Sequence, residues 1–360
     1  MKSSVATKKR QNVNQLTIGI DLGDRWGHYC ILDEYGEVLE EGRVPMTRKA
    51  LTAHFSGVPA RIAMEAGAYS AWISEHLSAM GHEVIVANAR ELRAISGSNN
   101  KNDRADAEKL ARFARVDPKI LRPIQHRSLA AQQHLTVIRA RAAAVRARSL
   151  VVNAVRGLVK PFGCRLTLCS TAAFPSRHHD SLPDELRPAL EPLLATITEL
   201  SIRIKGYDKQ IVAMSETLYP DTHRLREVHG VGPLTALTFI LTLEDKQRFQ
   251  VSRDVGCFLG LRPRQYQSGS SDPQLHITKA GDVYLRTLLV ECAQHILGPF
   301  GTDSAIRRWG LSLVERGGKI AKRRATIAVA RKLAVLLHRI WVTDEPYQPF
   351  YGMKSEPQTA

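Results

Sequence analysis

Hydrophobic and polar residues alternate along several short stretches in the N-terminal third of the chain. Alternation at every second position is typical of half-buried strands, whereas apolar residues at every third or fourth position indicate helices. Strands are predicted at Leu16–Gly23, His28–Asp33, Glu37–Val44, Ala60–Ala66 and His82–Asn88, and helices at Arg48–Phe55, Ser70–Met80 and Asp103–Arg115. The order β-β-β-α-β-α-β-α combines an antiparallel meander with parallel crossovers, which excludes a plain doubly wound sheet.

Two long helices are predicted after this sheet. Within residues 126–160 the apolar positions are spaced alternately three and four residues apart, as in a coiled-coil seam, and the same spacing returns from Leu193 to Met214. A loop that starts at Pro161-Phe162-Gly163 and extends to Pro183 would let the second helix fold back antiparallel to the first. The outward positions of the first helix are predicted to carry Arg139, Arg141, Arg146, Arg148 and Arg156. Such an arm could clamp nucleic acid or pair two protomers, and the sequence leaves both open.

These patterns predict a fold of class α/β plus α. The N-terminal element order is that of an RNase H-like domain, which we expect over residues 17–125 after a basic flexible arm at residues 1–16. A long antiparallel coiled-coil arm with an intervening loop is expected over residues 126–224, and a mainly helical C-terminal domain over residues 225–342. The polar tail at residues 343–360 is expected to be frayed.

Charge indicates the kind of partner. The 360 residues carry 51 Lys and Arg against 35 Asp and Glu, for a formal net charge of +16. Residues 90–165 contribute 17 cations and five carboxylates, and Lys319–Arg339 contributes seven cations and no carboxylate. Clustered cations gain affinity for phosphate backbones by displacing counterions, so a nucleic acid is the expected partner. Two well-solvated helix faces would give the same pattern.

Other classes are excluded by composition. The uncharged run Val231–Leu243 is shorter than the ~20 residues that a membrane span needs, so we expect no membrane partner. The five cysteines are scattered and show neither a disulfide framework nor a paired zinc spacing. We therefore expect a protein of a reducing cytoplasm.

Four carboxylates occupy positions that favour a metal site. Asp21 ends the first predicted strand, Glu65 ends the fourth, and Asp103 and Asp106 lie three residues apart at the start of a helix. The ends of the first and fourth strands are neighbours in an RNase H-like sheet, so the four side chains are expected to converge. Like charges at close range are costly unless a cation is present, and hard oxygen ligands suit Mg²⁺ or Mn²⁺. Taken alone, Asp103 and Asp106 are better explained as charges that favour a helix N-terminus, and the metal-site prediction depends on their combination with Asp21 and Glu65.

The first strand also has a competing interpretation. Its sequence IGIDLG resembles the first phosphate loop of actin-like ATPases and sugar kinases. That interpretation requires a second phosphate loop and a glycine-rich adenosine loop, and the sequence contains neither.

A glycine-containing turn precedes a predicted helix in HGVGPLTA, His229–Ala236. Backbone N–H groups at such a turn can bind a phosphate, as in helix-hairpin-helix DNA binding, which makes Gly230 and Gly232 candidate nucleic-acid contacts. The same two glycines could simply form a tight turn between helices, and the sequence does not decide between the two roles.

A loop rich in serine and glycine spans Gly260–Arg286. A serine hydroxyl there could meet a phosphate held by nearby cations, for which the candidates are Arg262, Arg264, Lys279 and Arg286. The residues alone do not distinguish Ser268, Ser270 and Ser271, and they favour a flexible polar loop over a catalytic one.

Five motifs in order give the chain a family resemblance. They are IGIDLG, AMEAGAY, NKNDRADAEKLA, VHGVGPLTA and the segment from GLRPRQYQSGSS to HITKAGDVYLRTLLVE. Together they resemble the DEDD-type insertion-sequence transposases, a family that includes the Piv-type DNA invertases, over about residues 16–342. The basic arm before Leu16 and the loop around Cys164–Pro183 match nothing in that pattern.

The resemblance implies specific roles. Asp21, Glu65, Asp103 and Asp106 would be the catalytic, metal-binding DEDD set of a RuvC-like domain, and Ser268 in QSG the nucleophile of a C-terminal transposase domain. Members are implied to be recombinases guided by a structured bridge RNA, which assemble on donor and target DNA as tetramers built from dimers and associate with the nucleoid when active.

The hypothesis that follows is a recombinase that cuts and rejoins DNA through a covalent phosphoserine at Ser268, with Mg²⁺ or Mn²⁺ at the DEDD set. Whether Ser268 meets the carboxylates of its own protomer or of a neighbour stays open. One rival is a RuvC-like Holliday-junction nuclease in which water is the nucleophile. The other is a non-catalytic scaffold that binds nucleic acid.

Overall fold

The protein is described here by a computed structural model covering residues 16–88, 102–273 and 275–351. The chain divides into two compact units, Met1–Leu129 and Ala130–Ala360, each of which is described by itself. Nearly all of the predicted basic arm at residues 1–16 lies outside the described residues.

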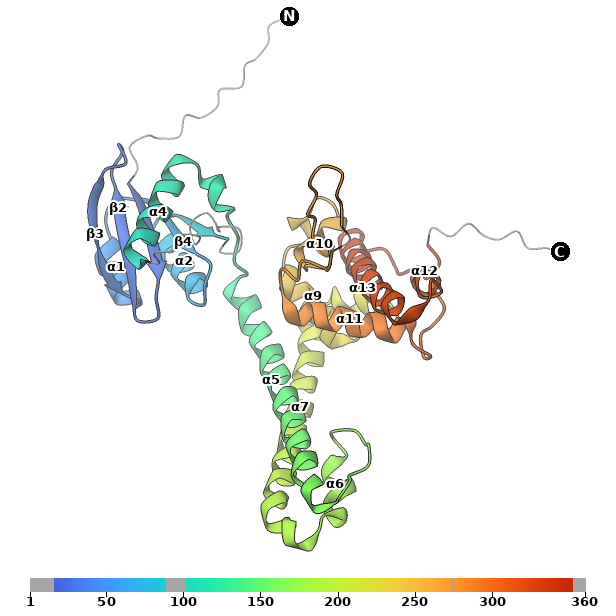
Figure 1. The fold of residues 1–360 in the computed structure, drawn as a ribbon. Helices are drawn as coiled ribbons and strands as arrows, with labels where there is room; N and C mark the ends of the chain where they lie inside the picture. Colours follow the sequence, from blue (N-terminus) through green and yellow to red (C-terminus); the bar gives the residue numbers. More distant parts are fainter. Residues whose placement is uncertain (1–15, 89–101, 274, 352–360) are drawn as a thin grey trace, which may run out of the picture. The chain divides into compact units, whose positions relative to one another are not determined.

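The first unit is built on a five-stranded mixed sheet with the order β3-β2-β1-β4-β5 (Figure 1). β1 pairs antiparallel with β2 and parallel with β4, and β4 pairs parallel with β5. The strands are β1 (Thr17–Leu22), β2 (Trp26–Leu32), β3 (Val38–Pro45), β4 (Arg61–Glu65) and β5 (Glu83–Ala87), and the helices are α1 (Arg48–Phe55), α2 (Ser70–Ala79) and α4 (Asp103–Val116). The predicted mixture of meander and crossovers is confirmed, and this sheet fits an RNase H-like fold.

The sheet is covered on both faces. Ile18 and Ile20 of β1 belong to a core that includes Leu51 of α1 and Leu77 of α2. Because successive strand residues point to opposite faces, Gly19 lies on the other face, beneath α4. A Cβ atom at Gly19 would lie 2.0 Å from the Ala107 carbonyl oxygen, so α4 approaches β1 as closely as a backbone can.

The second unit is mainly helical. Its helices are α5 (Leu129–Leu158), α6 (Phe174–His178), α7 (Arg187–Thr217), α8 (Thr222–Arg226), α9 (Pro233–Leu243), α10 (Arg253–Phe258), α11 (Val283–Leu297), α12 (Ala305–Val314) and α13 (Gly318–Thr343). Apolar residues on α9, α11 and α13 form its main core. Every residue of α9 from Thr235 to Leu243 is buried, as expected for a helix that is apolar on all sides.

The two long helices α5 and α7 lie side by side (Figure 1). Arg141 Nε donates to Asp208 Oδ1 at 2.5 Å, and Arg148 Nη1 donates to Ser201 Oγ at 3.1 Å. Arg156 packs over the ring of Phe174. The prediction that Arg141, Arg148 and Arg156 point outward is therefore wrong, because each has a partner within the unit.

The segment predicted as a loop between these helices is packed. It contains α6, and Phe174 and Leu182 are buried against the ends of α5 and α7. The simple-loop prediction missed this tip because its apolar residues are too few and too irregularly spaced to show a period. They are buried in one cluster with apolar residues of the two helix ends.

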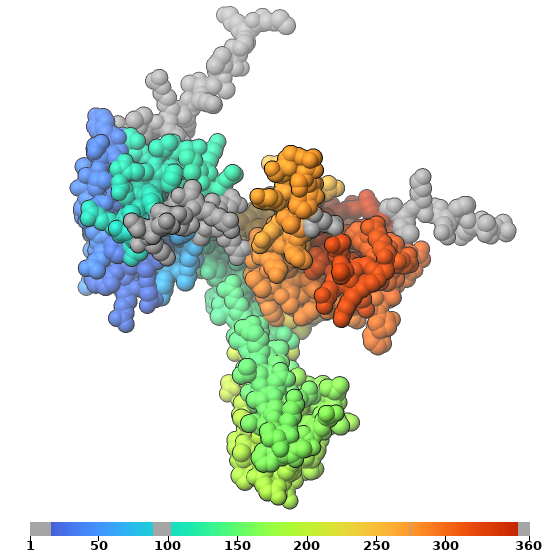
Figure 2. Space-filling view, viewed as in Figure 1, coloured from blue at the N-terminus to red at the C-terminus, as the bar shows by residue number. Residues whose placement is uncertain are grey.

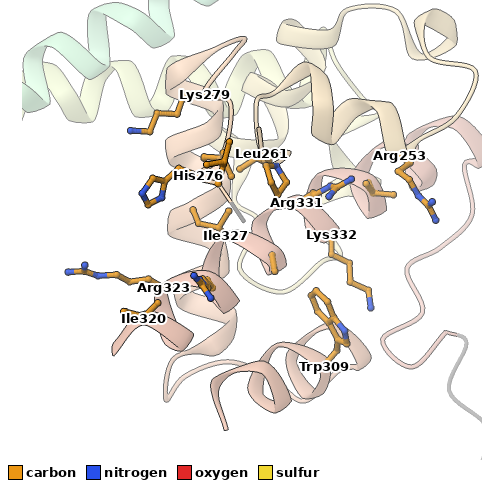
Figure 3. Close-up of a pocket in the computed structure, with 16 residues that line it drawn as sticks. Arg253, Leu261, His276, Lys279, Trp309, Ile320, Arg323, Ile327, Arg331 and Lys332 are labelled. Carbon is orange, nitrogen blue, oxygen red and sulfur yellow. The ribbon is translucent and has the colours of Figure 1, made fainter. Parts of the chain in front are cut away.

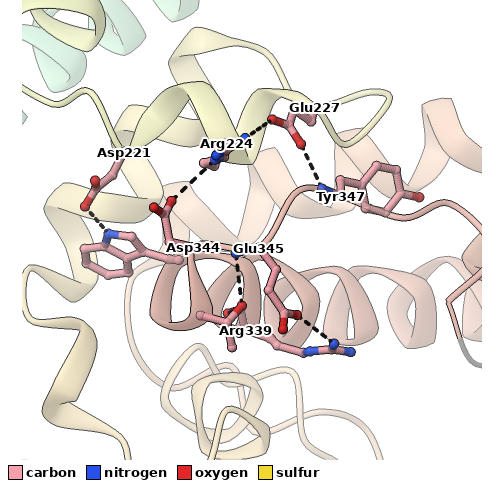
Figure 4. A network of polar contacts seen from close by, with 9 residues as sticks. Asp221, Arg224, Glu227, Arg339, Asp344, Glu345 and Tyr347 are labelled. Atoms are coloured by element: carbon pink, nitrogen blue, oxygen red, sulfur yellow. Dashed lines mark hydrogen bonds and ion pairs between the residues drawn. The ribbon is translucent and has the colours of Figure 1, made fainter.

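The end of the described chain is docked, which corrects the prediction of a frayed tail for residues 344–351. Tyr347 N donates to Glu227 Oε2 at 2.8 Å, and Arg224 Nε donates to Asp344 Oδ1 at 3.4 Å (Figure 4). Arg339 Nη2 donates to Glu345 Oε2 at 3.2 Å. The tail is polar, but its polar groups are paired with α8 and α13.

Candidate active site

The carboxyl ends of two neighbouring parallel strands bring Asp21 and Glu65 to one edge of the sheet. Ile20 of β1 is in register with Met64 of β4, so Asp21 and Glu65 are the next residues along adjacent strands. Asp21 lies on the same face of β1 as Gly19, which is the face covered by α4.

Helix α4 supplies the other two carboxylates. Asn102 caps its N-terminus by accepting a hydrogen bond from Arg104 N, and Asp103 and Asp106 lie in its first turn. The same helix passes over Gly19, with Ala107 and Ala111 against the strand. The small residues on β1 and α4 thus place the first turn of α4 beside Asp21.

The ionisation of Asp21 is sensitive to the other three carboxylates. Burial raises the pKa of Asp21 above its ordinary value of 3.8, and the charges of Asp103, Asp106 and Glu65 raise it further. His28 acts in the opposite direction. The fold therefore disfavours the ionised form of Asp21 and would gain from a positive charge at this edge.

Two basic side chains that the sequence analysis missed already pair with the set. His28 Nδ1 lies 3.7 Å from Asp103 Oδ2, and Lys109 Nζ lies 3.1 Å from Asp106 Oδ1. The signal for Lys109 is its position one helical turn after Asp106. His28 could have been found by counting the β1–β2 register, in which it lies directly opposite Asp21.

The donor set fits a hard divalent cation in its chemistry, since four carboxylates are the ligands that Mg²⁺ and Mn²⁺ prefer. Within residues 16–88, 102–273 and 275–351, however, no three His, Cys, Asp or Glu side chains form a ready metal site. Asp103 and Asp106 would have to exchange His28 and Lys109 for a metal ion.

Ser268 occupies the tip of an exposed hairpin in the second unit. Ser268 N donates to Ser271 O at 3.1 Å, and Ser271 N donates back to Ser268 O at 3.0 Å. Gly269 begins the two-residue turn with φ +56°, a backbone conformation that glycine favours. Figure 2 shows the orange segment that contains this hairpin standing out from the surface of its unit.

Backbone contacts hold the two sides of the hairpin base together. Pro263 bridges to Ile277, and Arg264 N donates to His276 O at 2.9 Å. A Cβ atom at Gly260 would lie 2.2 Å from Ala280 N, so the two sides of the base are in backbone contact. The loop predicted as flexible and polar is thus an extended hairpin.

Family comparisons identify the chain. A model described as the transposase IS116/IS110/IS902 family matches residues 222–305, and a DEDD transposase model of the IS110 type matches residues 18–162. The transposase of insertion sequence element IS1328 from Yersinia enterocolitica is 31% identical over 298 residues, covering 78% of this chain and 84% of that protein. This chain belongs to the IS116/IS110/IS902 family of transposases.

Two further relatives extend the comparison. The transposase of insertion sequence element IS1111A from Coxiella burnetii is 28% identical over 358 residues, covering 96% of this chain and 95% of that protein. The pilin gene-inverting protein of Moraxella lacunata is 24% identical over 314 residues, covering 86% of this chain and 88% of that protein. The resemblance to DEDD-type transposases and gene-inverting proteins is confirmed, and the protein is an enzyme of DNA strand transfer.

The predicted nucleic-acid contacts of the transposase lie in different settings. Arg262, Arg264 and Lys279 are exposed on the hairpin, and Arg139 and Arg146 are exposed on α5. Arg286 is 9% exposed, and its Nη1 donates to Leu259 O and Ala280 O. This geometry favours a structural role for Arg286 at the hairpin base over the predicted contact with nucleic acid.

The HGVGP turn of the transposase is observed as a packed turn. Gly230 has φ +89°, and a Cβ atom there would lie 3.2 Å from His295 Cδ2 on α11. Gly232 is the N-cap of α9 and has open space around it. Gly230 is thus explained by packing, whereas Gly232 leaves room for a ligand.

No helix among the described residues of the transposase is both long and apolar enough to cross a membrane.

Proposed function

We propose that this transposase cuts and rejoins DNA strands through a covalent bond between DNA and Ser268. The observation that carries the proposal is the presentation of Ser268 at the tip of a braced, exposed hairpin, with Arg262 and Arg264 exposed on the same hairpin. A nucleophile on such a tip can enter the groove of a DNA duplex, and the arginines can hold the phosphate that it attacks.

In the proposed step, Ser268 Oγ bonds to phosphorus and the bond from phosphorus to the 3′ oxygen breaks. The hydroxyl proton leaves Ser268, and the departing 3′ oxygen takes up a proton. The phosphoserine ester retains the bond energy, so a 3′-hydroxyl of the partner strand can reverse the step without ATP. Because serine is a weak nucleophile at neutral pH, a base or a metal must activate it.

The carboxylates Asp21, Glu65, Asp103 and Asp106 would hold Mg²⁺ or Mn²⁺. When bound, such an ion supplies positive charge that stabilises the attacking and departing oxygens. Lys109 would neutralise Asp106 until then, and His28 would lie beside Asp103. Ser268 belongs to the other compact unit, and it would meet these carboxylates in its own protomer or in a neighbour.

The proposal also includes a guide RNA, an oligomeric state and a division into domains. A structured bridge RNA would select donor and target DNA, and the α5–α7 arm would be a coiled coil that helps to build a tetramer from dimers at the nucleoid. The net charge of +16 and the exposed Arg139 and Arg146 support nucleic-acid contacts along the chain. We retain the division into a RuvC-like domain at residues 17–125, an arm at 126–224 and a transposase domain at 225–342.

Replacement of the nucleophile tests this function. With donor and target DNA and the copurifying RNA, Ser268→Ala is expected to abolish covalent protein–DNA adducts and to leave nucleic-acid binding intact. Ser270→Ala is the matched control, because Ser270 is exposed in the same turn, and it should retain adducts. Adducts that persist in Ser268→Ala would refute the assignment.

The same experiment addresses the nuclease rival. If water is the nucleophile, denaturing gels will show cut strands with free ends and no attached protein in the unaltered transposase. A scaffold that only binds nucleic acid would give neither adducts nor cut strands.

A further inference from the structure

A groove of about 1270 Å³ runs through the second unit beside the base of the Ser268 hairpin (Figure 3). Its walls are the hairpin base, α12 and one face of α13, and Arg253 of α10 lies at its edge. We propose that this groove binds single-stranded DNA adjacent to the phosphate that Ser268 attacks. The inference rests on the proposed function and adds the state of the DNA that the transposase recognises.

The groove is strongly cationic. Six lining residues carry positive charge and none carries negative charge: Arg253, Lys279, Arg323, Arg324, Arg331 and Lys332. Within the described parts of the chain, none of the six forms an ion pair with a carboxylate. Uncompensated cations around one hollow indicate a polyanionic ligand.

Four of the six cations, Arg323, Arg324, Arg331 and Lys332, belong to one helix, α13. The groove-facing residues of α13 recur every three or four positions from Ile320 to Val335, which is one helical face. The opposite face carries Val329, Leu333 and Leu337, which are fully buried in the core. The core therefore fixes the rotation of α13 and keeps its arginines in the groove.

The apolar residues that line the groove favour a single-stranded ligand over a duplex. Ile320 is 65% exposed, and Leu275 and Trp309 are each 37% exposed. Lys332 Nζ lies 4.4 Å from the centre of the Trp309 ring. A duplex offers mainly phosphates to a cationic surface, whereas a single strand also offers unstacked bases, which bind aromatic and apolar side chains in sites of this kind.

The groove also leads to the nucleophile. Pro263 and Ile277, which are bridged across the hairpin, both line the groove, and Ser268 lies at the tip of the same hairpin. A strand held in the groove would thus continue toward Ser268. Since Ser268 is proposed to act on DNA, we assign the groove to DNA that has been opened next to the cut.

Binding to the full-length transposase tests the proposal. Fluorescence anisotropy would compare a labelled single-stranded DNA of about 15 nucleotides, the duplex and single-stranded RNA of the same sequence. We expect the single-stranded DNA to bind most tightly. Trp309→Leu should weaken its binding by about tenfold, whereas Trp309→Phe, which keeps an aromatic ring, should change it little.

The charges are tested by salt dependence. Arg323→Ala combined with Arg324→Ala should reduce the slope of log affinity against log salt by about 1.4, or about 0.7 for each lost phosphate contact. Lys205→Ala combined with Lys209→Ala removes two exposed cations from α7 and should leave the slope unchanged. Thermal unfolding of each variant would verify that it is folded.

Three results would overturn the proposal. Tighter binding of the duplex with no effect of Trp309→Leu would assign the cations to a duplex backbone. Equal or tighter binding of the single-stranded RNA would assign the groove to the guide RNA. Equal salt slopes in the Arg323→Ala/Arg324→Ala variant and in the Lys205→Ala/Lys209→Ala variant would show that the groove does not bind nucleic acid. Binding is measured without cleavage, so failure here leaves the Ser268 adduct test unaffected.

Discussion

Asp21 occupies a position that its own fold makes unfavourable for a charged side chain. Burial and three nearby carboxylates all raise its pKa. A structural aspartate would be expected to have compensating donors, as Asp221 has in Trp341 Nε1 at 2.7 Å. A half-buried carboxylate whose ionised form is disfavoured by burial and by neighbouring like charges is a common property of functional sites.

Because the fold disfavours a charged Asp21, replacing Asp21 should increase the stability of the metal-free protein and weaken metal binding. Asp21→Asn removes a charge that the folded state disfavours, so it should raise the midpoint of thermal unfolding without metal. The same change removes a ligand, so the further increase that Mn²⁺ produces in the unaltered protein should shrink. Differential scanning fluorimetry with and without Mn²⁺ measures both effects.

Glu75→Gln is the control, because Glu75 is an exposed carboxylate on α2 of the same unit. It should leave both midpoints unchanged. An unaltered Mn²⁺ response in Asp21→Asn would argue against Asp21 as a ligand.

At the scale of elements, periodicity predicted most of the fold. The predicted strand at Ala60–Ala66 is observed as Arg61–Glu65, and the helix predicted at Asp103–Arg115 is observed as Asp103–Val116. Such segments bury one face or both against neighbours, so their hydrophobic pattern is complete in the sequence. The tip around Phe174 depends on contacts with distant helix ends, which no local pattern records.

One titratable residue on α13, His338, predicts that the stability of the second unit depends on pH. His338 is 1% exposed, its Nδ1 lies 2.9 Å from Ser252 Oγ and its Nε2 lies 3.1 Å from Lys246 O. Burial lowers its pKa below the ordinary value of 6.5, although the bond to Lys246 opposes this. The unfolded chain therefore binds the proton more readily than the folded one.

The stability that neutral His338 contributes should be fully present above pH 6.5 and lost as the pH falls from there through the lowered pKa. Urea unfolding at about pH 7.5 and about pH 5.5 measures the loss. His338→Gln should show a smaller difference between the two conditions, whereas the exposed control His223→Gln should match the unaltered protein. An identical difference in His338→Gln would contradict the assignment.

At the scale of the whole molecule, the chain divides after Leu129 into two compact units. Each unit has its own core, with Ile20 and Ile62 in one and Leu285 and Leu333 in the other. Units with separate cores can unfold separately.

We therefore expect residues 1–129 and residues 130–360, produced as separate polypeptides, each to unfold cooperatively when followed by circular dichroism. A break after Leu243 should instead prevent folding of the second unit, because it separates Phe239 from Trp341, whose ring centres are 6.4 Å apart. Failure of either separate unit to show a cooperative transition would contradict the division.

The candidate site was predictable only in part. The carboxylates could be placed because strand ends and a helix start are local features. His28 required the exact pairing of β1 with β2, and the groove required α13 to pack beside a hairpin some 50 residues earlier in the chain, which the sequence pattern of neither element reveals. Residues so far apart in the sequence can be recognised as neighbours only in the three-dimensional structure.

The docked tail has a consequence for the order of events during synthesis. Asp344, Glu345 and Tyr347 complete the polar contacts of α8 and α13, yet Asp344 is synthesised 120 residues after its partner Arg224 (Figure 4). The N-terminal unit can fold while the rest is still being translated, because domains fold as units during elongation. The unit with the serine, in contrast, reaches its final form only after these residues have been added, so a nascent chain that stops before Asp344 is not yet fully folded.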